Sequence, residues 1–185
     1  MASMQPAAGP ALDTCPVRRG PALRALALGL ALACASSGAV AQLDRDSDLF
    51  KAMAAHDHAF FERGFNQCDL DYLEQAVHPH LRFYHDQSGF QDYAAFLQNA
   101  RRYLCADPDH KPVRKLDADS LQVVPLYADG ELYAVIHMGS HRFFIREPGK
   151  DDSATGIARF SNLYVLEDGR WLLKDVLSYD HRPAD

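Results

Sequence analysis

The sequence has no apolar segment long enough to cross a membrane as a helix. Its longest apolar run, ALALGLALACA from Ala25 to Ala35, falls well short of the ~20 residues that a bilayer-spanning helix requires. An excess of positive charge is also absent, because 19 lysines and arginines stand against 25 aspartates and glutamates. Such an acidic chain is poorly suited to binding a polyanion, so we expect no nucleic acid as a partner.

Common signatures of metal and nucleophile sites are missing as well. The sequence has no HExxH and no paired CxxC, and its histidines are dispersed, so nothing supports a metal site. It also lacks G-x-S-x-G, the pattern of a serine nucleophile on a strand-to-helix turn. We therefore expect neither a metal nor another cofactor.

Residues 1–41 are organised like a secretory signal. Three arginines precede the apolar run, and Ala39-Val40-Ala41 suits signal peptidase. We predict cleavage after Ala41, which leaves a periplasmic or secreted protein with no membrane attachment. A retained membrane anchor, lipid attachment at Cys34 and a true start at Met4 are the alternatives.

Only two of the four cysteines, Cys68 and Cys105, lie after the predicted signal. Two cysteines in an exported protein most simply form one disulfide, and two buried thiols are the alternative. The predicted bridge ties the segment after the first helix to the end of a later helix. Residues 42–185 have a length that suits a single domain with a substantial core.

Helical spacing of apolar residues predicts three helices after the signal. The first is long and covers residues 46–67, where Leu49, Phe50 and further apolar residues recur at this spacing. The second covers residues 69–76, with Asp69 as its N-cap. The third covers residues 91–104.

Alternating or apolar segments predict five strands. They cover residues 81–86, 115–127, 131–146, 154–167 and 170–180. Two helices, a strand, a helix and four strands follow one another in this order. That order predicts an α+β domain rather than repeated βαβ units.

The last two predicted strands form a hairpin around Asp168-Gly169, because both central positions of a two-residue loop favour positive φ. Pairing Glu167 with Arg170 fixes the register. It places Tyr164 opposite Leu173, Asn162 opposite Asp175, Phe160 opposite Leu177, Ala158 opposite Tyr179 and Arg159 opposite Ser178. Both faces are then largely apolar with a few polar groups, which indicates a sheet covered on both sides and a pocket.

The order of elements, together with FYHDQSG before the third helix and ARFSNLYVLEDGRWLLKDVLSYDH near the end, resembles the nuclear transport factor 2-like superfamily. The resemblance is to its SnoaL-like and domain-of-unknown-function branch, and it covers residues 46–182. It implies a cone-shaped fold, in which a strongly curved mixed or antiparallel sheet wraps around a long first helix. It also implies a cone mouth that often holds a ligand, and a homodimer packed through the outer face of the sheet.

Polar residues near the expected pocket are the candidates for chemistry. Histidine titrates near neutrality and suits proton transfer, with a carboxylate to orient it and a tyrosine to polarise a carbonyl. The catalytic candidates are His85, Asp86, His137, Tyr179 and Asp180. The ligand-binding candidates are Tyr84, His141, Arg159 and His181. The plainer alternative is that the histidines are ordinary surface or hairpin residues, and that Arg159 forms a structural ion pair with Asp180.

These patterns predict a protein that binds a small organic molecule, or that carries out a metal-free acid/base reaction such as dehydration or isomerisation. Relatives in the superfamily include enzymes and binding modules, so the fold does not decide between these functions. The alternative is a non-catalytic interaction or assembly module whose cone is filled by its own side chains.

Overall fold

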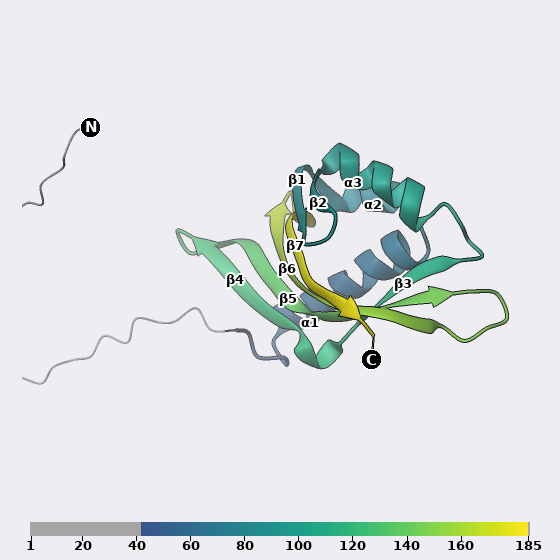
Figure 1. The fold of residues 1–185 in the computed structure, drawn as a ribbon. Helices are drawn as coiled ribbons and strands as arrows, with labels where there is room; N and C mark the ends of the chain where they lie inside the picture. The colour runs from purple at the N-terminus through teal and green to yellow at the C-terminus, as the bar shows by residue number, and fades with distance from the viewer. Residues whose placement is uncertain (1–41, 185) are drawn as a thin grey trace, which may run out of the picture. The chain divides into compact units, whose positions relative to one another are not determined.

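The computed structural model describes residues 42–184, and the predicted signal lies outside the described residues (Figure 1). Its helices are α1 (Asp48–Ala59), α2 (Leu70–Ala76) and α3 (Tyr93–Asn99), with π-helical turns η1 (Phe60–Asn66) after α1 and η2 (Ala100–Leu104) after α3, and a 3-10 turn η3 (Ala118–Ser120). Its strands are β1 (Val77–His85), β2 (Gly89–Asp92), β3 (Lys111–Leu116), β4 (Gln122–Ala128), β5 (Glu131–Arg146), β6 (Ser153–Glu167) and β7 (Arg170–Pro183). In this part of the chain, no helix is long and apolar enough to span a membrane.

The strands form one mixed sheet in the order β2-β1-β7-β6-β5-β3, and β4 also pairs with β5. Only the β1–β7 pairing is parallel among these strands. Figure 1 shows the sheet curving around α1, with α2 and α3 next to each other across the opening from it. The predicted α+β class and the curved sheet around the first helix are confirmed.

The first helix begins at a well-formed cap and buries one apolar stripe. The Ser47 hydroxyl accepts a hydrogen bond from the Phe50 backbone N–H at 3.3 Å, which satisfies one of the free N–H groups of the first turn. Phe50, Met53 and Phe60 are buried in the core. α1 and η1 run without a break from residue 48 to residue 66, so the predicted helix over residues 46–67 is confirmed to within two residues at its ends.

The predicted strand over residues 115–127 is wrong in one respect, because it is two strands. The chain leaves the sheet at Asp117 and turns through η3 before β4 begins. The Ser120 hydroxyl donates to the Asp117 carbonyl at 2.6 Å and accepts from the Ser140 backbone N–H at 2.8 Å. Polar side chains that can bond nearby backbone favour such turns over strands. As a result β3 and β4 pair with opposite ends of the long strand β5.

The hairpin register is correct near its turn and wrong beyond it. Asp168 and Gly169 both have positive φ, at 49° and 72°, and Tyr164 pairs with Leu173 as predicted. The register then shifts at Lys174, where one extra residue in β7 forms a bulge. The observed pairs beyond it are Leu163 with Asp175, Asn162 with Val176, Phe160 with Ser178 and Arg159 with Tyr179. The shift turns Ser178 toward the inner face and Tyr179 toward the outer face.

The predicted disulfide between Cys68 and Cys105 is present, with a Cα–Cα distance of 5.7 Å. It links the residues that follow the two π-helical turns. Next to it the Lys111 ammonium donates to the backbone carbonyls of Phe65 and Leu104, at 2.8 and 3.1 Å. The bridge and the lysine therefore hold η1 and η2 together.

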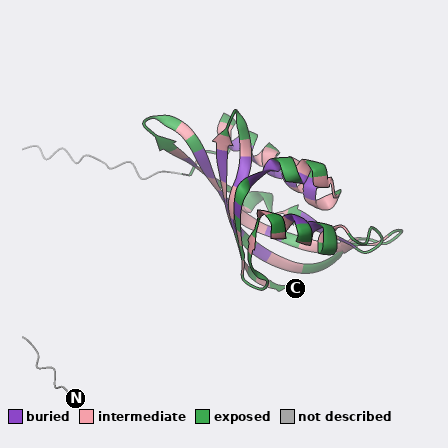
Figure 2. Ribbon diagram, turned by 90° about the horizontal axis from the view of Figure 1, so that it is seen from above, coloured by how far each residue is buried: buried purple, intermediate pink, exposed green. Residues whose placement is uncertain are grey.

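The main core lies between the inner face of the sheet and the helices, and Figure 2 shows buried residues alternating with exposed ones along the strands. Tyr164, Val135 and Leu173 contribute to it from neighbouring strands. A smaller cluster of Ala134, Val165 and Leu172 covers part of the outer face. The alternation follows from the two-residue period of a strand.

Candidate functional site

A cavity of about 490 Å³ lies between the helices and the inner face of the sheet. Most of its wall is aromatic or aliphatic, with Phe83 from β1, Phe96 from α3 and Phe160 from β6. Nine histidine, serine, asparagine and glutamine residues also line it, although most of its surface is apolar. A mainly apolar cavity of several hundred Å³ that also carries polar groups is typical of a site for a small organic molecule.

The two π-helical turns build one side of the cavity. In a π-helix each backbone N–H bonds five residues back, as the Gln67 N–H does to the Glu62 carbonyl at 2.9 Å. The wider turn brings Phe60, Phe61 and Phe65 of η1 onto the cavity wall together. Leu104 of η2 and its neighbour Tyr103 face them. The segment that the disulfide fixes is therefore also the segment that shapes the cavity.

His181 and Asp86 form a hydrogen-bonded dyad at the cavity. The Asp86 carboxylate accepts from His181 Nδ1 at 2.6 Å and from the His181 backbone N–H at 3.1 Å. Because a carboxylate only accepts, the proton of a neutral His181 ring lies on Nδ1 and leaves Nε2 as a free base. Partial desolvation opposes ionisation of Asp86, but the hydrogen bonds from His181 outweigh it and hold the Asp86 pKa below its usual value.

The His85 ring stacks on His181, with ring centroids 4.2 Å apart and planes 17° apart. Its Nδ1 accepts hydrogen bonds from the backbone N–H groups of Gln87 and Ser88, at 3.1 and 3.3 Å. The neutral ring therefore carries its proton on Nε2. Burial lowers the pKa of His85, and the positive charge that His181 can carry lowers it further. At Nε2 the neutral His85 ring is therefore a donor, and the neutral His181 ring is an acceptor.

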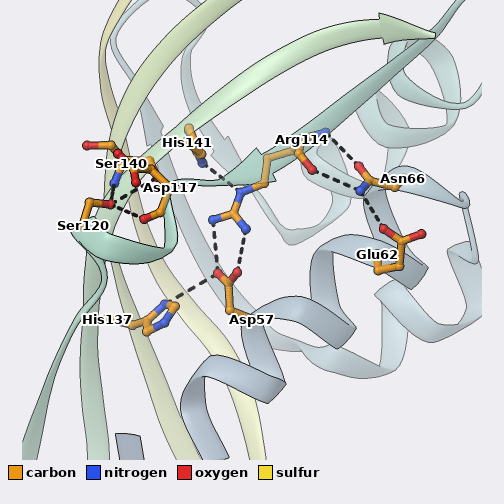
Figure 3. Close-up of polar contacts among 9 residues, drawn as sticks. All are labelled: Asp57, Glu62, Asn66, Arg114, Asp117, Ser120, His137, Ser140 and His141. Atoms are coloured by element: carbon orange, nitrogen blue, oxygen red, sulfur yellow. Dashed lines mark hydrogen bonds and ion pairs between the residues drawn. The ribbon is translucent and has the colours of Figure 1, made fainter. Parts of the chain in front are cut away.

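Figure 3 shows a buried ion pair that connects the first helix to strand β3. Arg114 of β3 donates two hydrogen bonds to Asp57 of α1, at 2.6 and 3.2 Å, and both side chains are 1% exposed. The Arg114 guanidinium also lies 3.7 Å from the centre of the Phe61 ring. This pairing joins the first helix to the edge of the sheet through charge-assisted hydrogen bonds.

Arg114 fixes the tautomer of His141 on the cavity wall. Arg114 Nε donates to His141 Nδ1 at 3.1 Å, so the histidine proton lies on Nε2 (Figure 3). Burial first, and the adjacent guanidinium second, lower the His141 pKa to about 2. His141 is therefore a neutral donor, and its Nε2 is buried without a hydrogen-bond partner in residues 42–184.

A second polar wall group lies further along the sheet. Asn162 is 2% exposed and lines the cavity, and its Oδ1 has no hydrogen-bond partner among the described residues. Asn162 pairs across the sheet with His137, which is fully buried and lies 3.8 Å from Asp57. Burial lowers the His137 pKa to about 4. Buried polar atoms are almost always satisfied, but Asn162 Oδ1 and His141 Nε2 have almost no accessible surface, so a ligand or water atom reaches them only when neighbouring side chains move.

No family model matches this sequence, and no curated protein matches it either. Solved structures do match. A protein from Xanthomonas campestris described as a calcium/calmodulin-dependent protein kinase II association domain has a TM-score of 0.56 at 16% identity, over 75% of this chain and 91% of its own. A nuclear transport factor 2-like superfamily protein from Salmonella enterica has a TM-score of 0.52 at 16% identity, over 73% and 92%. The chain has the nuclear transport factor 2-like fold.

A third structure of this fold, from Catenulispora acidiphila, is a complex with S-DNPA. It has a TM-score of 0.57 at 10% identity, over 70% of this chain and 91% of its own. At this identity the likeness concerns the fold alone. The site in the present nuclear transport factor 2-like chain must therefore be argued from its own residues.

The fold places four predicted site residues at or next to the cavity: His85, Asp86, His141 and His181. It does not bring the others there. Three lie on the outer face of the sheet: Tyr84, Arg159 and Tyr179. The shifted register explains Tyr179, which now pairs with Arg159 on the outer face, and the Arg159 guanidinium lies 5.5 Å from the centre of its ring.

Two further expectations need correction. His137 is on the inner face with His141, as predicted, but it lies in the buried wall and does not line the cavity. Asp180 is exposed and pairs with Arg182 at 3.9 Å, not with Arg159. Its φ of 59° coincides with a second register shift in β7, between Tyr179 and Arg182, so Ser178 and His181 both line the cavity although they are three residues apart.

His85, Asp86 and His181 offer ligand atoms within 4.8 Å of one another, a grouping that could hold a metal ion. The nitrogens nearest to Asp86 are already engaged. His85 Nδ1 accepts from two backbone N–H groups, and His181 Nδ1 donates to the carboxylate. A metal there would have to displace these bonds, so the residues suit a proton-transfer site better than a metal site.

The buried pair of Asp57 and Arg114 and the orientation of Ser178 were not predicted from the sequence. Asp57 follows Phe50 and Met53 on the buried stripe of α1, and a carboxylate at such a position signals a buried partner. Arg114 carries no comparable local signal. The inward orientation of Ser178 depends on the bulge at Lys174, which no local pattern predicts.

Proposed function

We propose that the cavity binds a small, mainly apolar organic molecule, and that His181 exchanges a proton with it. The observation that carries this proposal is the dyad: Asp86 accepts the Nδ1 proton of His181 at 2.6 Å, and the ring lines the cavity. A carboxylate that orients an imidazole raises the efficiency of its other nitrogen as a base. Dehydration and isomerisation both need such a base.

The wall also supports a preference for a ligand with few polar atoms. His141 Nε2 supplies one buried donor and Asn162 Oδ1 one buried acceptor, while the wall around them is mostly apolar. Both atoms lie just behind the cavity surface, so after a small movement of the wall a carbonyl or ether oxygen would satisfy His141, and a hydroxyl would satisfy Asn162. Leaving a buried polar atom unmatched costs about 1–3 kcal/mol, so a ligand that matches both is favoured over a hydrocarbon.

Binding can be tested with the uncharged fluorescent dye N-phenyl-1-naphthylamine. The wild-type protein is expected to bind it at one saturable site, and Ala100→Trp, which fills the cavity, should weaken binding at least about tenfold. The matched control is Ala94→Trp on the exposed side of α3, which should bind normally. Equal binding by both variants would place the dye elsewhere and count against the proposal. A native mass spectrum of the wild-type protein would also report a retained organic molecule.

The dyad has its own test, which needs no substrate. In the wild-type protein, ¹⁵N spectra should give His181 a protonated Nδ1 and an unprotonated Nε2. Asp86→Asn removes the carboxylate, and the two tautomers should then become mixed. An unchanged tautomer in the variant would mean that Asp86 does not orient the ring.

The alternative function, a non-catalytic assembly module with a filled cone, has one supporting observation. The Xanthomonas campestris protein of the same fold is described as an association domain. A cavity of about 490 Å³ argues against the filled cone, because ordinary cores hold few voids larger than a water molecule. Binding of a small molecule therefore has the stronger support.

We also propose that the outer face of the sheet joins two copies of the chain. Phe90, Tyr84 and Leu177 lie side by side on β2, β1 and β7, and each is about half exposed. The Arg82–Asp175 ion pair lies beside them on the same face. In a two-fold dimer the same patch meets itself. The apolar row can then pack on its own copy, and the Arg82 and Asp175 charges of one copy can pair with those of the other. Leu177→Glu should shift the protein to a monomer in sedimentation experiments, and a wild-type monomer would refute the dimer.

Export from the cytoplasm is the third part of the proposal. The Cys68–Cys105 disulfide supports it, since structural disulfides persist in oxidising compartments. The signal-like composition of residues 1–41 supports it as well. Fractionation of cells that express the full chain would test it, and a reduced, uncleaved cytoplasmic product would be the contrary result.

A further inference from the structure

Ser178 lies beside the His181–Asp86 dyad. It is 7% exposed and lines the cavity. A regular strand would place Ser178 and His181 on opposite faces of the sheet, because they are three residues apart. The positive φ of Asp180 removes that constraint, so Ser178 and His181 come together on the inner side of β7.

The three side chains form a connected series. Ser178 Oγ lies 3.4 Å from His181 Nε2, and His181 Nδ1 lies 2.6 Å from Asp86 Oδ1. Nucleophile, base and orienting carboxylate in this order activate a serine hydroxyl, and the first contact is often loose in a protein without substrate. We propose that Ser178 is a nucleophile and that the protein hydrolyses small apolar carboxylic esters. This inference rests on the proposed small-molecule cavity and names its reaction and substrate class.

A donor for the developing oxyanion is available next to Ser178. His85 and Ser178 are register partners on the parallel strands β1 and β7, and both side chains line the cavity. The backbone N–H groups of Gln87 and Ser88 occupy His85 Nδ1, which leaves the ring proton on Nε2. We assign this N–H to the oxyanion, because a fixed donor in a desolvated site stabilises the charge that forms there.

The reaction balances with water as the only co-reactant. Ser178 Oγ attacks the ester carbonyl carbon while its proton passes to His181 Nε2. The tetrahedral intermediate then breaks the bond to the alcohol oxygen, which takes the proton from His181 and leaves an acyl ester on Ser178. Water attacks this acyl ester and gives a proton to His181, which returns it to Ser178 Oγ as the carboxylic acid is released.

The cavity wall limits which esters can react. Around Ser178 it offers Phe83, Phe143, Phe160 and Val176, and no lysine, arginine, aspartate or glutamate side chain lines it within residues 42–184. An uncharged acyl group is therefore favoured over a dicarboxylic or cationic one.

The test uses the full wild-type chain and two probes, diisopropyl fluorophosphate and p-nitrophenyl butyrate. The fluorophosphate should attach one group per chain, and peptide mapping should place it on Ser178. The ester should give a burst of p-nitrophenol followed by a slower steady rate. Ser178→Ala should lose the label and lower the hydrolysis rate at least about 100-fold.

The matched control is Ser161→Ala, a serine of the neighbouring strand β6 on the opposite face, which should behave as wild type. Ser178→Cys keeps a nucleophile of similar size and should retain a burst. If Ser178→Ala fails to fold, this second variant still tests whether the residue at position 178 is the nucleophile. No label on the wild-type chain, or a label at another residue, would overturn the inference. In that case saturable dye binding by the same preparation would leave the small-molecule cavity standing, and absent binding would remove both.

Discussion

Arg114 and Asp57 form a two-point ion pair inside the molecule, although they are 57 residues apart in the chain. Their hydrogen bonds measure 2.6 and 3.2 Å, and neither side chain is more than 1% exposed. The same guanidinium donates to His141 on the cavity wall. A single buried arginine therefore connects the first helix, the edge strand and the site.

Removing one partner of this pair should be strongly destabilising. Arg114→Met keeps much of the side-chain volume but leaves the Asp57 carboxylate buried without its partner. We expect a loss of about 3–5 kcal/mol in the free energy of unfolding, measured by urea denaturation. Arg142→Met, at an exposed position of β5, is the control and should change stability by less than about 0.5 kcal/mol. A loss below about 1 kcal/mol for Arg114→Met would contradict the buried pairing.

The stability of the protein should fall in mild acid because of two buried histidines. In the folded protein, burial lowers the pKa of His137 to about 4 and that of His141 to about 2, from an ordinary value of 6.5. Below pH 6.5 the unfolded chain binds protons at these rings that the folded protein does not bind. Stability is thus complete above pH 6.5 and falls as pH decreases toward the folded pKa values, by roughly 1 kcal/mol per pH unit for each ring.

Urea denaturation at pH 7.0, 6.0 and 5.0 would measure this dependence. His137→Phe replaces a ring with no hydrogen-bond partner among the described residues by an apolar ring, and should flatten the curve. The exposed His58, replaced by Gln, serves as the control and should leave the curve unchanged. A wild-type curve that stays level between pH 7.0 and 5.0 would be the contrary result.

The disulfide should contribute strongly to stability. Cys68 and Cys105 are 37 residues apart. Closing a loop of that length lowers the conformational entropy of the unfolded chain, which increases the free energy of unfolding by about 3–4 kcal/mol. Dithiothreitol should lower the urea midpoint of the wild-type protein, while the double variant Cys68→Ala/Cys105→Ala should not respond to it. Mapping of alkylated peptides from unreduced, denatured protein should find neither cysteine labelled; labels at both would exclude the bridge.

The sequence predicted the hairpin correctly where neighbouring residues alone determine its structure. Asp168 and Gly169 adopt the positive φ values that the hairpin loop needs, and the register holds as far as Tyr164 and Leu173. It fails at Lys174, where β7 contains an extra residue. The packing of both faces of the sheet selects a bulge, and a dipeptide pattern contains no information on it.

The candidate site was predicted in part for a similar reason. His85, Asp86, His141 and His181 were found because polar residues in apolar strands attract attention. Their connections were not found, since Asp86 and His181 lie 95 residues apart. The sequence can indicate which residues need partners, but only the assembled sheet determines which partner each of them meets.

The backbone at Asp180 should control the dyad more than its carboxylate does. Its φ of 59° is costly for most residues with a side chain and costs glycine little. Its ion pair with Arg182, at 3.9 Å on an exposed surface, contributes little. Asp180→Gly is therefore expected to keep the stability and the His181 tautomer of the wild-type protein.

Asp180→Val should behave differently, because a β-branched residue is strongly disfavoured at positive φ. We expect a loss of about 1–2 kcal/mol in urea denaturation. If the strand regularises, His181 turns away from Asp86 and Ser178, and the ¹⁵N signals of its ring should show mixed tautomers. Equal stability and an unchanged His181 tautomer in both variants would mean that the conformation of Asp180 does not position the site. Mixed His181 tautomers in Asp180→Gly but not in Asp180→Val would instead mean that the Asp180 carboxylate helps to hold the His181 ring in place.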